Sequence, residues 1–307
     1  MQADHLENGY VELRGERWCV MRCRTLLLLV AVVCFFGHES HAQTPALATR
    51  YYDAGDKKRR QGDWFGAVED FTKAIELNAH LNRAKWQNKK QTSDQAFDNS
   101  QPDSSEVAVS DSFTAYAYTN RGVARFYLKD FDAAITDFER ALRIKPKLAE
   151  AYSGRGAARI GKGDHEGALL DFERALAINK KLVEVYSNRG QVLLQQKDFA
   201  RAIEDFNRAI ELRPTMVAAY EGRGESFMRQ ARFDLAVNDF TAALKLNPGN
   251  AETYANRGLT LIVLGREQEA LSDLQKCVEL NPELKTTLET RTELAKKLMR
   301  VYTARSQ

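Results

Sequence analysis

Few residues of this sequence could carry out catalysis or bind a metal ion. Beyond residue 42 the chain holds two histidines, His80 and His165, and one cysteine, Cys277. Neither histidine has a sequence neighbour that would make a catalytic triad or a metal site. The sequence has no glycine-rich phosphate loop ending in Lys-Ser/Thr, no His-Glu-x-x-His motif and no cysteine pair at metal-binding spacing. We therefore predict no catalytic residue, no metal site, no cofactor and no enzyme activity.

The composition is that of a folded, soluble chain. Of the 307 residues, 44% are hydrophobic and 28% are charged, and the formal net charge is only +3. Lysine and arginine alternate with acidic residues along the chain, whereas a nucleic-acid-binding surface gathers basic residues on one face. We therefore expect no nucleic-acid partner, and no small-molecule substrate is evident.

The first 42 residues have the pattern of an export signal. An uninterrupted apolar run at 26–36 follows Arg22 and Arg24 and precedes the small-x-small sequence at 40–42. The run is shorter than the roughly 20 residues that a bilayer-spanning helix needs. We predict cleavage after Ala42 and export, to the periplasm. An uncleaved leader that tethers the protein to a membrane is the alternative.

Two details bear on this leader. Met21 directly precedes the basic residues, so translation from that residue would give an ordinary short signal and leave 1–20 unmade. Val33 stands before Cys34, where a lipoprotein signal requires a small residue, and this disfavours lipid attachment. Cleavage after Ala42 leaves Cys277 alone, so the mature chain has no internal disulfide.

A period of 34 residues organises the remainder of the chain. Glycine, alanine and phenylalanine recur at this interval, with one leucine in place of the last phenylalanine: Gly122, Gly156, Gly190, Gly224 and Gly258; Ala134, Ala168, Ala202, Ala236 and Ala270; Phe138, Phe172, Phe206, Phe240 and Leu274. A further copy lies upstream, with Gly55, Ala67 and Phe71 in the same register. Small residues let helices approach closely and rings fill the space between units, so the pattern predicts stacked helix pairs.

This repeat resembles the tetratricopeptide repeat. That unit of 34 residues carries an aromatic at position 4, glycine at 8, alanine at 20 and 27, an aromatic at 24 and proline at 32. Numbered in this way, the chain has six repeats, here called repeats 1 to 6, at 48–81, 115–148, 149–182, 183–216, 217–250 and 251–284. Position 4 is tyrosine in all six, but position 32 is Ala79 in repeat 1 and Lys180 in repeat 3. The resemblance implies an all-α fold, a right-handed superhelical α-solenoid of helix-turn-helix repeats.

The sequence therefore divides into five parts. An N-terminal extension and signal peptide (1–42) precede the first repeat unit (43–81), and a flexible polar insertion (82–114) separates that unit from the five contiguous repeats (115–284). The insertion is rich in Asn, Gln, Ser, Asp and Lys, which cannot sustain a packed core. A short helical extension through Trp86 is the alternative for its beginning, and the first unit either sits apart from the other five or packs against Tyr118 and its neighbours. Residues 285–307 carry a narrow apolar stripe and resemble the capping helix of the family. A helix lying on a membrane surface is the alternative for this last part.

Two charged positions recur beside the packing residues. Position 7 is arginine and position 23 is aspartate in every contiguous repeat: Arg121, Arg155, Arg189, Arg223 and Arg257; Asp137, Asp171, Asp205, Asp239 and Asp273. A guanidinium can meet a carboxylate through two parallel hydrogen bonds, so we predict structural pairs between them. Cys277 stands at position 27, where the repeat needs a small buried residue, and is therefore expected to be structural.

The resemblance also implies where a partner binds, because in this family the first helix of each repeat lines the inner surface. Positions 2, 5, 6, 9, 12 and 13 would face it. The partner-binding candidates are Tyr116, Thr119, Asn120, Glu150, Ser153, Glu184, Ser187, Asn188, Gln191, Gln195, Glu221, Glu225, Arg229, Glu252 and Asn256. They form a polar, acidic surface suited to an extended peptide. Capture of a C-terminal carboxylate is disfavoured, because the lysines that accompany asparagine in that subtype are absent.

The sequence thus predicts a protein- or peptide-binding scaffold or adaptor without enzyme activity, exported to the cell envelope. A factor that assembles or maintains an envelope complex, or an adaptor tethered through its leader, is the alternative.

Overall fold

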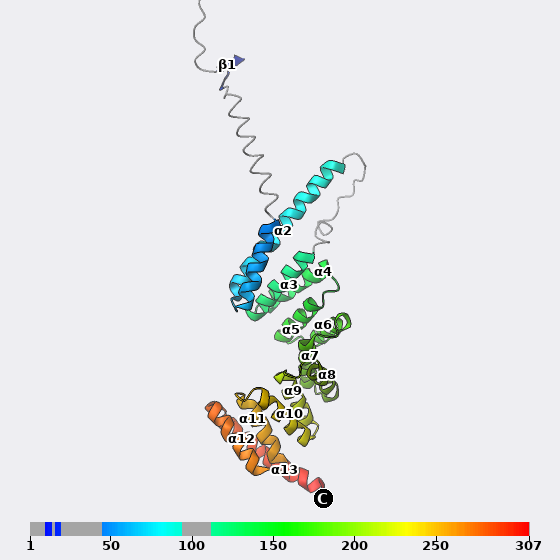
Figure 1. Cartoon of the computed structure of the whole chain (residues 1–307), viewed down its shortest axis with the longest axis vertical. Coiled ribbons are helices and arrows are strands. Elements are labelled where there is room, and N and C mark those ends of the chain that lie inside the picture. The colour runs from blue at the N-terminus through cyan, green and yellow to red at the C-terminus, as the bar shows by residue number, and fades with distance from the viewer. Residues whose placement is uncertain (1–9, 14–15, 20–44, 94–111, 307) are drawn as a thin grey trace, which may run out of the picture. The chain divides into compact units, whose positions relative to one another are not determined.

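The structure, a computed structural model, describes residues 10–13, 16–19, 45–93 and 112–306. The chain divides into two compact units, Met1–Ala124 and Arg125–Gln307. The apolar run at 26–36 and the predicted cleavage site after Ala42 lie outside the described residues. Every described element except one short hairpin is helical (Figure 1), which confirms the helical fold class.

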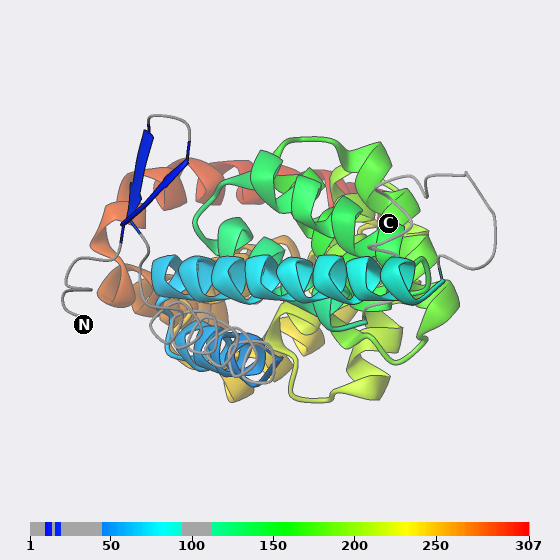
Figure 2. The same ribbon diagram turned by 90° about the horizontal axis from the view of Figure 1, so that it is seen from above.

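The exception is an antiparallel hairpin in the first unit. Strands β1 (Tyr10–Leu13) and β2 (Glu16–Cys19) pair with Tyr10 opposite Cys19 and Leu13 opposite Glu16 (Figure 2). This hairpin was not expected from the sequence and qualifies the all-α prediction. Its tyrosine, valine and tryptophan residues favour strands, and a two-residue gap containing glycine is typical of hairpins.

Helical segments make up the rest of the described first unit. Residues 45–60 are helical, α2 runs over Trp64–Ser93, and α3 (Ser112–Tyr127) begins within this unit. Helix α2 therefore continues through residues 82–93, which the sequence assigned to a flexible insertion. Ala79 takes the place of a helix-stopping proline, and residues 83–91 are mostly Ala, Lys, Gln and Arg, which favour helix. Residues 94–111 of that insertion lie outside the described part of the chain.

The second unit consists of helix pairs in the predicted register. The helices are α4 (Phe131–Ile144), α5 (Ala149–Gly161), α6 (His165–Ile178), α7 (Val183–Gln195), α8 (Phe199–Leu212), α9 (Val217–Arg229), α10 (Phe233–Leu246), α11 (Ala251–Val263), α12 (Glu267–Leu280), a 3-10 turn η2 (Pro282–Leu284) and α13 (Lys285–Ser306). The second helix of repeats 2 to 6 always ends at position 30. This holds in repeat 3, where Lys180 replaces proline, so the missing proline does not move the boundary.

The turn inside each pair has one geometry. The residue at position 15 adopts a positive φ in all five repeats of the second unit: 62° at Lys129, 79° at Gly163, 63° at Lys197, 58° at Ala231 and 75° at Gly265. In repeats 2 to 4 the next residue is an aspartate whose carboxylate accepts from a backbone N–H three residues further on. This cap satisfies a free N–H at the start of the second helix.

A buried ring at position 24 holds the helices of one repeat together and joins them to the next repeat. Phe206 is fully buried. A Cβ atom added to Gly190 of the same repeat would lie 2.9 Å from the Phe206 ring, and one added to Gly222 of the next repeat would lie 2.3 Å from it. A Cβ atom added to Gly154 would likewise collide with the Phe138 ring of the preceding repeat, and one added to Gly156 would collide with the Phe172 ring of its own repeat. The glycines therefore set the distance at which successive helices pack.

The arginine at position 7 adds polar links around this packing. Its Nε and Nη2 donate to both carboxylate oxygens of the aspartate at position 23, at 2.6–2.9 Å, in four pairs: Arg155–Asp171, Arg189–Asp205, Arg223–Asp239 and Arg257–Asp273. These hydrogen bonds are the main cause that raises the pKa of each of the four arginines. Each of the four guanidinium groups also lies over the tyrosine at position 4 of its own repeat.

The same arginine also reaches the preceding repeat. Arg223 Nη1 donates to Asn207 Oδ1 at 2.6 Å, and Arg257 Nη1 donates to Thr241 Oγ1 at 3.1 Å. Asn207 and Thr241 both occupy position 25. Arg223 and Arg257 therefore tie the two helices of their own repeats to the repeat before.

Repeat 1 packs on helix α3 through the same contacts. Within the first unit Arg121 Nη1 donates at 3.0 Å to Thr72 Oγ1, the residue at position 25 of repeat 1. Phe71 is fully buried in a cluster with Ala67 and Ala124. The insertion lengthens the connection but leaves this stacking contact in place. Asp70, whose repeat lacks an arginine at position 7, pairs instead with Lys58 at 2.8 Å.

The close approach at position 6 can be tested with Gly222→Ala. Alanine favours a helix over glycine by about 1 kcal/mol, but here the new methyl group would displace the buried Phe206 ring. We expect a net destabilisation of about 1–3 kcal/mol, measured as a lower midpoint of thermal unfolding by circular dichroism. Gly249→Ala is the control, because its Cβ would meet only Asn247 Oδ1 at 3.6 Å. A higher midpoint for Gly222→Ala would contradict the packing account.

The polar links can be tested with Asp171→Ala. Asp171 is fully buried and accepts hydrogen bonds from both Arg155 and Arg159. Its removal leaves two partly buried guanidinium groups without this carboxylate, so we expect a loss of about 3 kcal/mol in the free energy of unfolding. Glu211→Ala breaks an exposed pair with Arg208 and should leave the free energy of unfolding almost unchanged. Equal effects in chemical denaturation would show that burial of the pair is unimportant.

Candidate functional site

The first helices of repeats 3 to 6 line the inner side of the second unit. Helix α5 contacts α7, α7 contacts α9 and α9 contacts α11, whereas successive second helices approach one another less closely. In Figure 1, α5, α7 and α9 accordingly follow one side of this unit and α6, α8 and α10 the other. A stack of this kind curves toward its first helices. The inner face is therefore the concave one.

Helix α7 carries the longest polar stripe on this face. Glu184, Asn188, Gln191 and Gln195 follow one another at intervals of four, three and four, which places them on one side of the helix. Glu184, Gln191 and Gln195 are exposed, and Asn188 is half-buried. Asn188, Gln191 and Gln195 have no hydrogen-bonding partner among the described residues. The stripe therefore offers amide donors and acceptors that the fold does not use.

The neighbouring inner helices offer fewer polar side chains that a ligand could bind. On α5, Glu150 is exposed and Ser153 is half-buried. On α9, Glu225 Oε1 accepts a hydrogen bond from Arg229 Nη2 at 3.2 Å, so these two groove candidates bind each other. In the first unit, Tyr116 is exposed and Asn120 Nδ2 donates to Tyr52 Oη at 2.9 Å. Burial is the main cause that raises the pKa of Tyr52.

Three of the four candidates at position 5 are buried or engaged within the fold. Thr119 is 4% exposed and donates to the Ala115 carbonyl of its own helix, and Ser187 is 6% exposed. Glu221 Oε1 accepts from Asn250 Nδ2 at 2.7 Å and from Thr253 Oγ1 at 2.5 Å. Glu221 is therefore used in stacking on the next repeat, whereas Ser153 at the same position is half-buried.

Two arginines that the sequence did not single out bind the acidic groups of this face. Arg213 Nη1 lies 2.6 Å from Glu184 Oε1, with both side chains about half exposed. Arg291, on the capping helix α13, donates to Glu252 Oε2 at 3.2 Å and to Asn256 Oδ1 at 2.6 Å. The predicted acidic surface is thus largely paired with basic groups. Arg213 lies at position 31 and Arg291 lies beyond the last repeat, so the pattern of inner positions could not reveal them.

The remaining reactive residues have structural surroundings. Cys277 is fully buried in the core of repeat 6, and burial is the main cause that raises the pKa of its thiol. Within the described residues, no group of three or more His, Cys, Asp or Glu side chains could hold a metal ion. None of the described helices has both the length and the apolar character needed to cross a bilayer.

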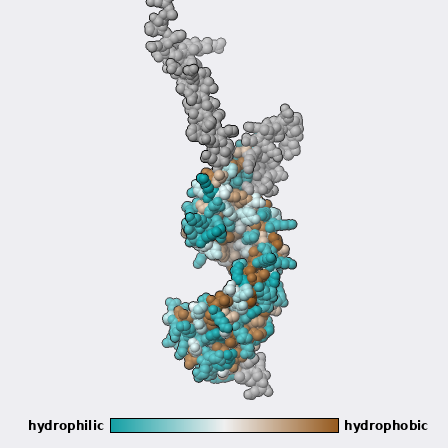
Figure 3. Space-filling view, in the orientation of Figure 1, coloured by the Kyte–Doolittle hydropathy of each residue, from teal (hydrophilic) through white to brown (hydrophobic). Residues whose placement is uncertain are grey.

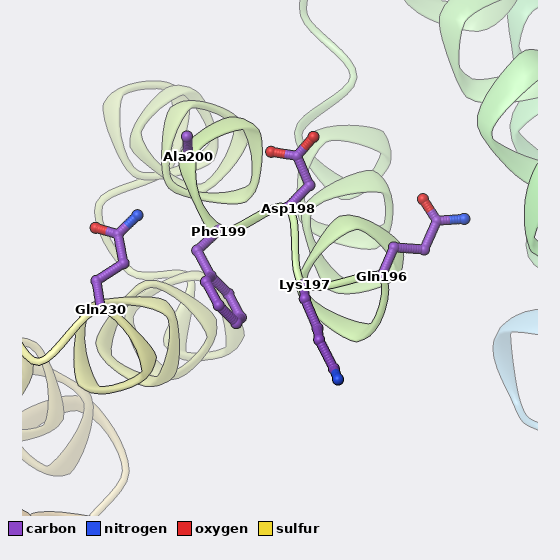
Figure 4. Close-up of a pocket in the computed structure, with 6 residues that line it drawn as sticks. All are labelled: Gln196, Lys197, Asp198, Phe199, Ala200 and Gln230. Carbon is purple, nitrogen blue, oxygen red and sulfur yellow. The ribbon is translucent and has the colours of Figure 1, made fainter.

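One small hollow lies at the turn of repeat 4. Its volume is about 440 Å³, and its lining residues are Gln196, Lys197, Asp198, Phe199, Ala200 and Gln230 (Figure 4). Asp198 is already used there, because it caps α8 and accepts from Arg201 Nε at 2.6 Å. The face drawn in Figure 3 is mostly hydrophilic, with apolar residues scattered over it.

Comparison with known proteins agrees with this architecture. Models of the tetratricopeptide repeat match residues 115–148, 183–216 and 221–283. The crystal structure of YrrB, described as a TPR protein with an unusual peptide-binding site, is 25% identical with a TM-score of 0.51 over 60% of this chain and 92% of that one. MamA (41-end) from Desulfovibrio magneticus RS-1 is 18% identical with a TM-score of 0.52, over 57% of this chain and 98% of that one, and shows the fold alone. No curated protein sequence matches.

The 34-residue register, the stacked helix pairs and the matching repeat models lead to one assignment. Residues 115–148, 183–216 and 221–283 are tetratricopeptide repeats.

Proposed function

We propose that this protein is an adaptor that binds an extended peptide segment of a partner protein along the inner face of its second unit. The observation that carries the proposal is the stripe on α7, where Asn188, Gln191 and Gln195 offer amide groups that no described residue satisfies. Elsewhere on this face the polar side chains are mostly engaged within the fold.

The stripe has the length and chemistry for a peptide backbone. From Glu184 to Gln195 an α-helix rises about 16 Å, which corresponds to about five residues of extended chain. A carboxamide both donates and accepts, so it can meet the N–H and C=O groups of an extended segment. The peptide-binding site attributed to the similar protein YrrB supports the same use of the fold.

The fold of stacked helix pairs is typical of interaction modules rather than of catalysts. A protein-interaction role accordingly fits the whole array, and the adaptor has no need of enzyme activity. A factor that assembles or maintains an envelope complex would use the same face, and it would differ in having one large partner.

We further propose that the adaptor works in the cell envelope. The support is the sequence alone: two arginines, the apolar run at 26–36 and the small-x-small pattern ending at Ala42. A leader that stays attached would instead tether the adaptor to the membrane.

The binding face can be tested with the double variant Gln191→Lys/Gln195→Lys. Both residues are exposed, so their replacement should leave the midpoint of thermal unfolding within about 2 °C of the unchanged protein. Partner recovery in a pull-down from the envelope fraction should fall at least about fivefold, because two bulky charges replace the amide groups. One stoichiometric partner in the pull-down would favour an assembly factor, and several weak partners would favour a scaffold.

The matched control is Asn238→Lys/Gln275→Lys, which adds the same charge on the outer helices α10 and α12. Asn238 and Gln275 are also exposed. This variant should recover the partner as the unchanged protein does. Equal recovery by both double variants would exclude the inner face as the binding surface.

Export predicts a defined N-terminus. Protein isolated from cells should begin at Gln43 when its terminal peptide is identified by mass spectrometry, and it should be found in the soluble envelope fraction. Detection of residues 22–36 in the isolated protein would refute cleavage and favour the tethered form.

A further inference from the structure

The capping helix shows what one part of the inner face can bind. The guanidinium of Arg291 on α13 donates hydrogen bonds to Glu252 and Asn256, which stand at positions 2 and 6 of repeat 6. The two acceptors are four residues apart on α11 and therefore lie on the same side of that helix. A planar guanidinium can donate to both at once through separate nitrogens.

The same pair of acceptors occurs in repeat 4. Glu184 and Asn188 occupy positions 2 and 6 of α7, two repeats before Glu252 and Asn256. Among the contiguous repeats only these two have both a carboxylate and a carboxamide at positions 2 and 6. The other three carry Tyr116 with Asn120, Glu150 with Gly154, and Ala218 with Gly222.

The pair in repeat 4 differs from the pair in repeat 6 because it can still accept hydrogen bonds from a ligand. Asn188 is half-buried without a hydrogen-bonding partner among the described residues. Glu184 is exposed, and its carboxylate Oε1 forms an ion pair with the half-exposed Arg213. Asn120 and Asn256, the asparagines at position 6 in repeats 2 and 6, both bind a side chain from another helix. Repeat 4 therefore keeps this asparagine available.

We propose that Glu184 and Asn188 bind the guanidinium of an arginine in the partner's extended segment. The inference rests on the proposed function, because it assigns a side-chain preference to the same inner face. Arg291 provides the pattern: one nitrogen of the ligand donates to the carboxylate and another to the amide oxygen. Lysine, with a single ammonium group, matches two separated acceptors less well.

Arg213 is a competitor for this carboxylate. Its ion pair with Glu184 is exposed and is worth little in water, so it does not block the site. A ligand arginine must nevertheless share Glu184 with a second positive charge. Removal of Arg213 should therefore strengthen arginine binding, whereas it would weaken the binding of an acidic ligand.

The test uses the protein as it accumulates in cells and four fluorescent heptapeptide mixtures. The central residue is fixed as Arg, Lys, Gln or Glu, the other six are randomised among uncharged residues, and both ends are blocked. Fluorescence anisotropy should show the Arg mixture binding roughly tenfold more tightly than the Gln mixture, because charge-assisted hydrogen bonds exceed neutral ones. Glu184→Gln should abolish this preference, Glu184→Lys should reverse it toward Glu, and Arg213→Ala should increase it.

Glu204→Gln on α8 is the matched control, since Glu204 is an exposed carboxylate on an outer helix. It should keep the preference for arginine, and circular dichroism should show all variants folded. Equal binding of the Arg and Gln mixtures, or a preference that survives Glu184→Gln, would overturn the inference while leaving peptide binding intact. Failure of every mixture to bind would overturn the proposed function and this inference with it.

Discussion

The close contact between the buried phenylalanine ring at position 24 and a glycine, which has no Cβ atom, sets how the helices pack. The phenylalanine at position 24 fills the space against the glycine at position 8 in repeats 1, 3, 4 and 5, and the rings of repeats 2 and 4 press on a glycine of the next repeat. A missing Cβ atom allows the helix axes to approach, and the ring removes the void that such an approach would otherwise leave. Because the rings of repeats 2 and 4 also reach the next repeat, part of the stability arises between repeats.

This constraint explains why the arginine at position 7 is retained beside the ring. Once the helices are set at this distance, Asp171, Asp205, Asp239 and Asp273 are nearly or fully buried and need a partner. The guanidinium supplies both hydrogen bonds and has further N–H groups for position 25 of the preceding repeat. Thr72 and Arg121 make the same contact across the insertion. The insertion therefore enters the connection between repeats without changing how repeat 1 stacks on α3.

The sequence predicts these features well because they recur in register. The helix pairs of repeats 2 to 6 follow from the 34-residue period, and the four arginine–aspartate pairs stand where the spacing places them. Features that occur once were harder to predict. The continuation of α2 to Ser93 depends on the lack of a stop signal at Ala79, and the hairpin at 10–19 depends on a few local residue types. Residues at position 5 were assigned to the surface by analogy, but Thr119 and Ser187 are buried.

The electrostatics of the inner face cannot be predicted from its own residues alone, because Glu184, Glu221 and Glu252 are bound by groups outside the inner positions. Glu221 is held by Asn250 and Thr253 of the loop and helix that follow, and Glu252 by Arg291 of the cap. A count of acidic residues therefore overstates the charge available to a ligand. What remains on α7 is a stripe of neutral amides beside one exposed carboxylate. A surface of this kind gains affinity from backbone hydrogen bonds and selectivity from a single charged contact, which is the combination that an adaptor for extended segments requires.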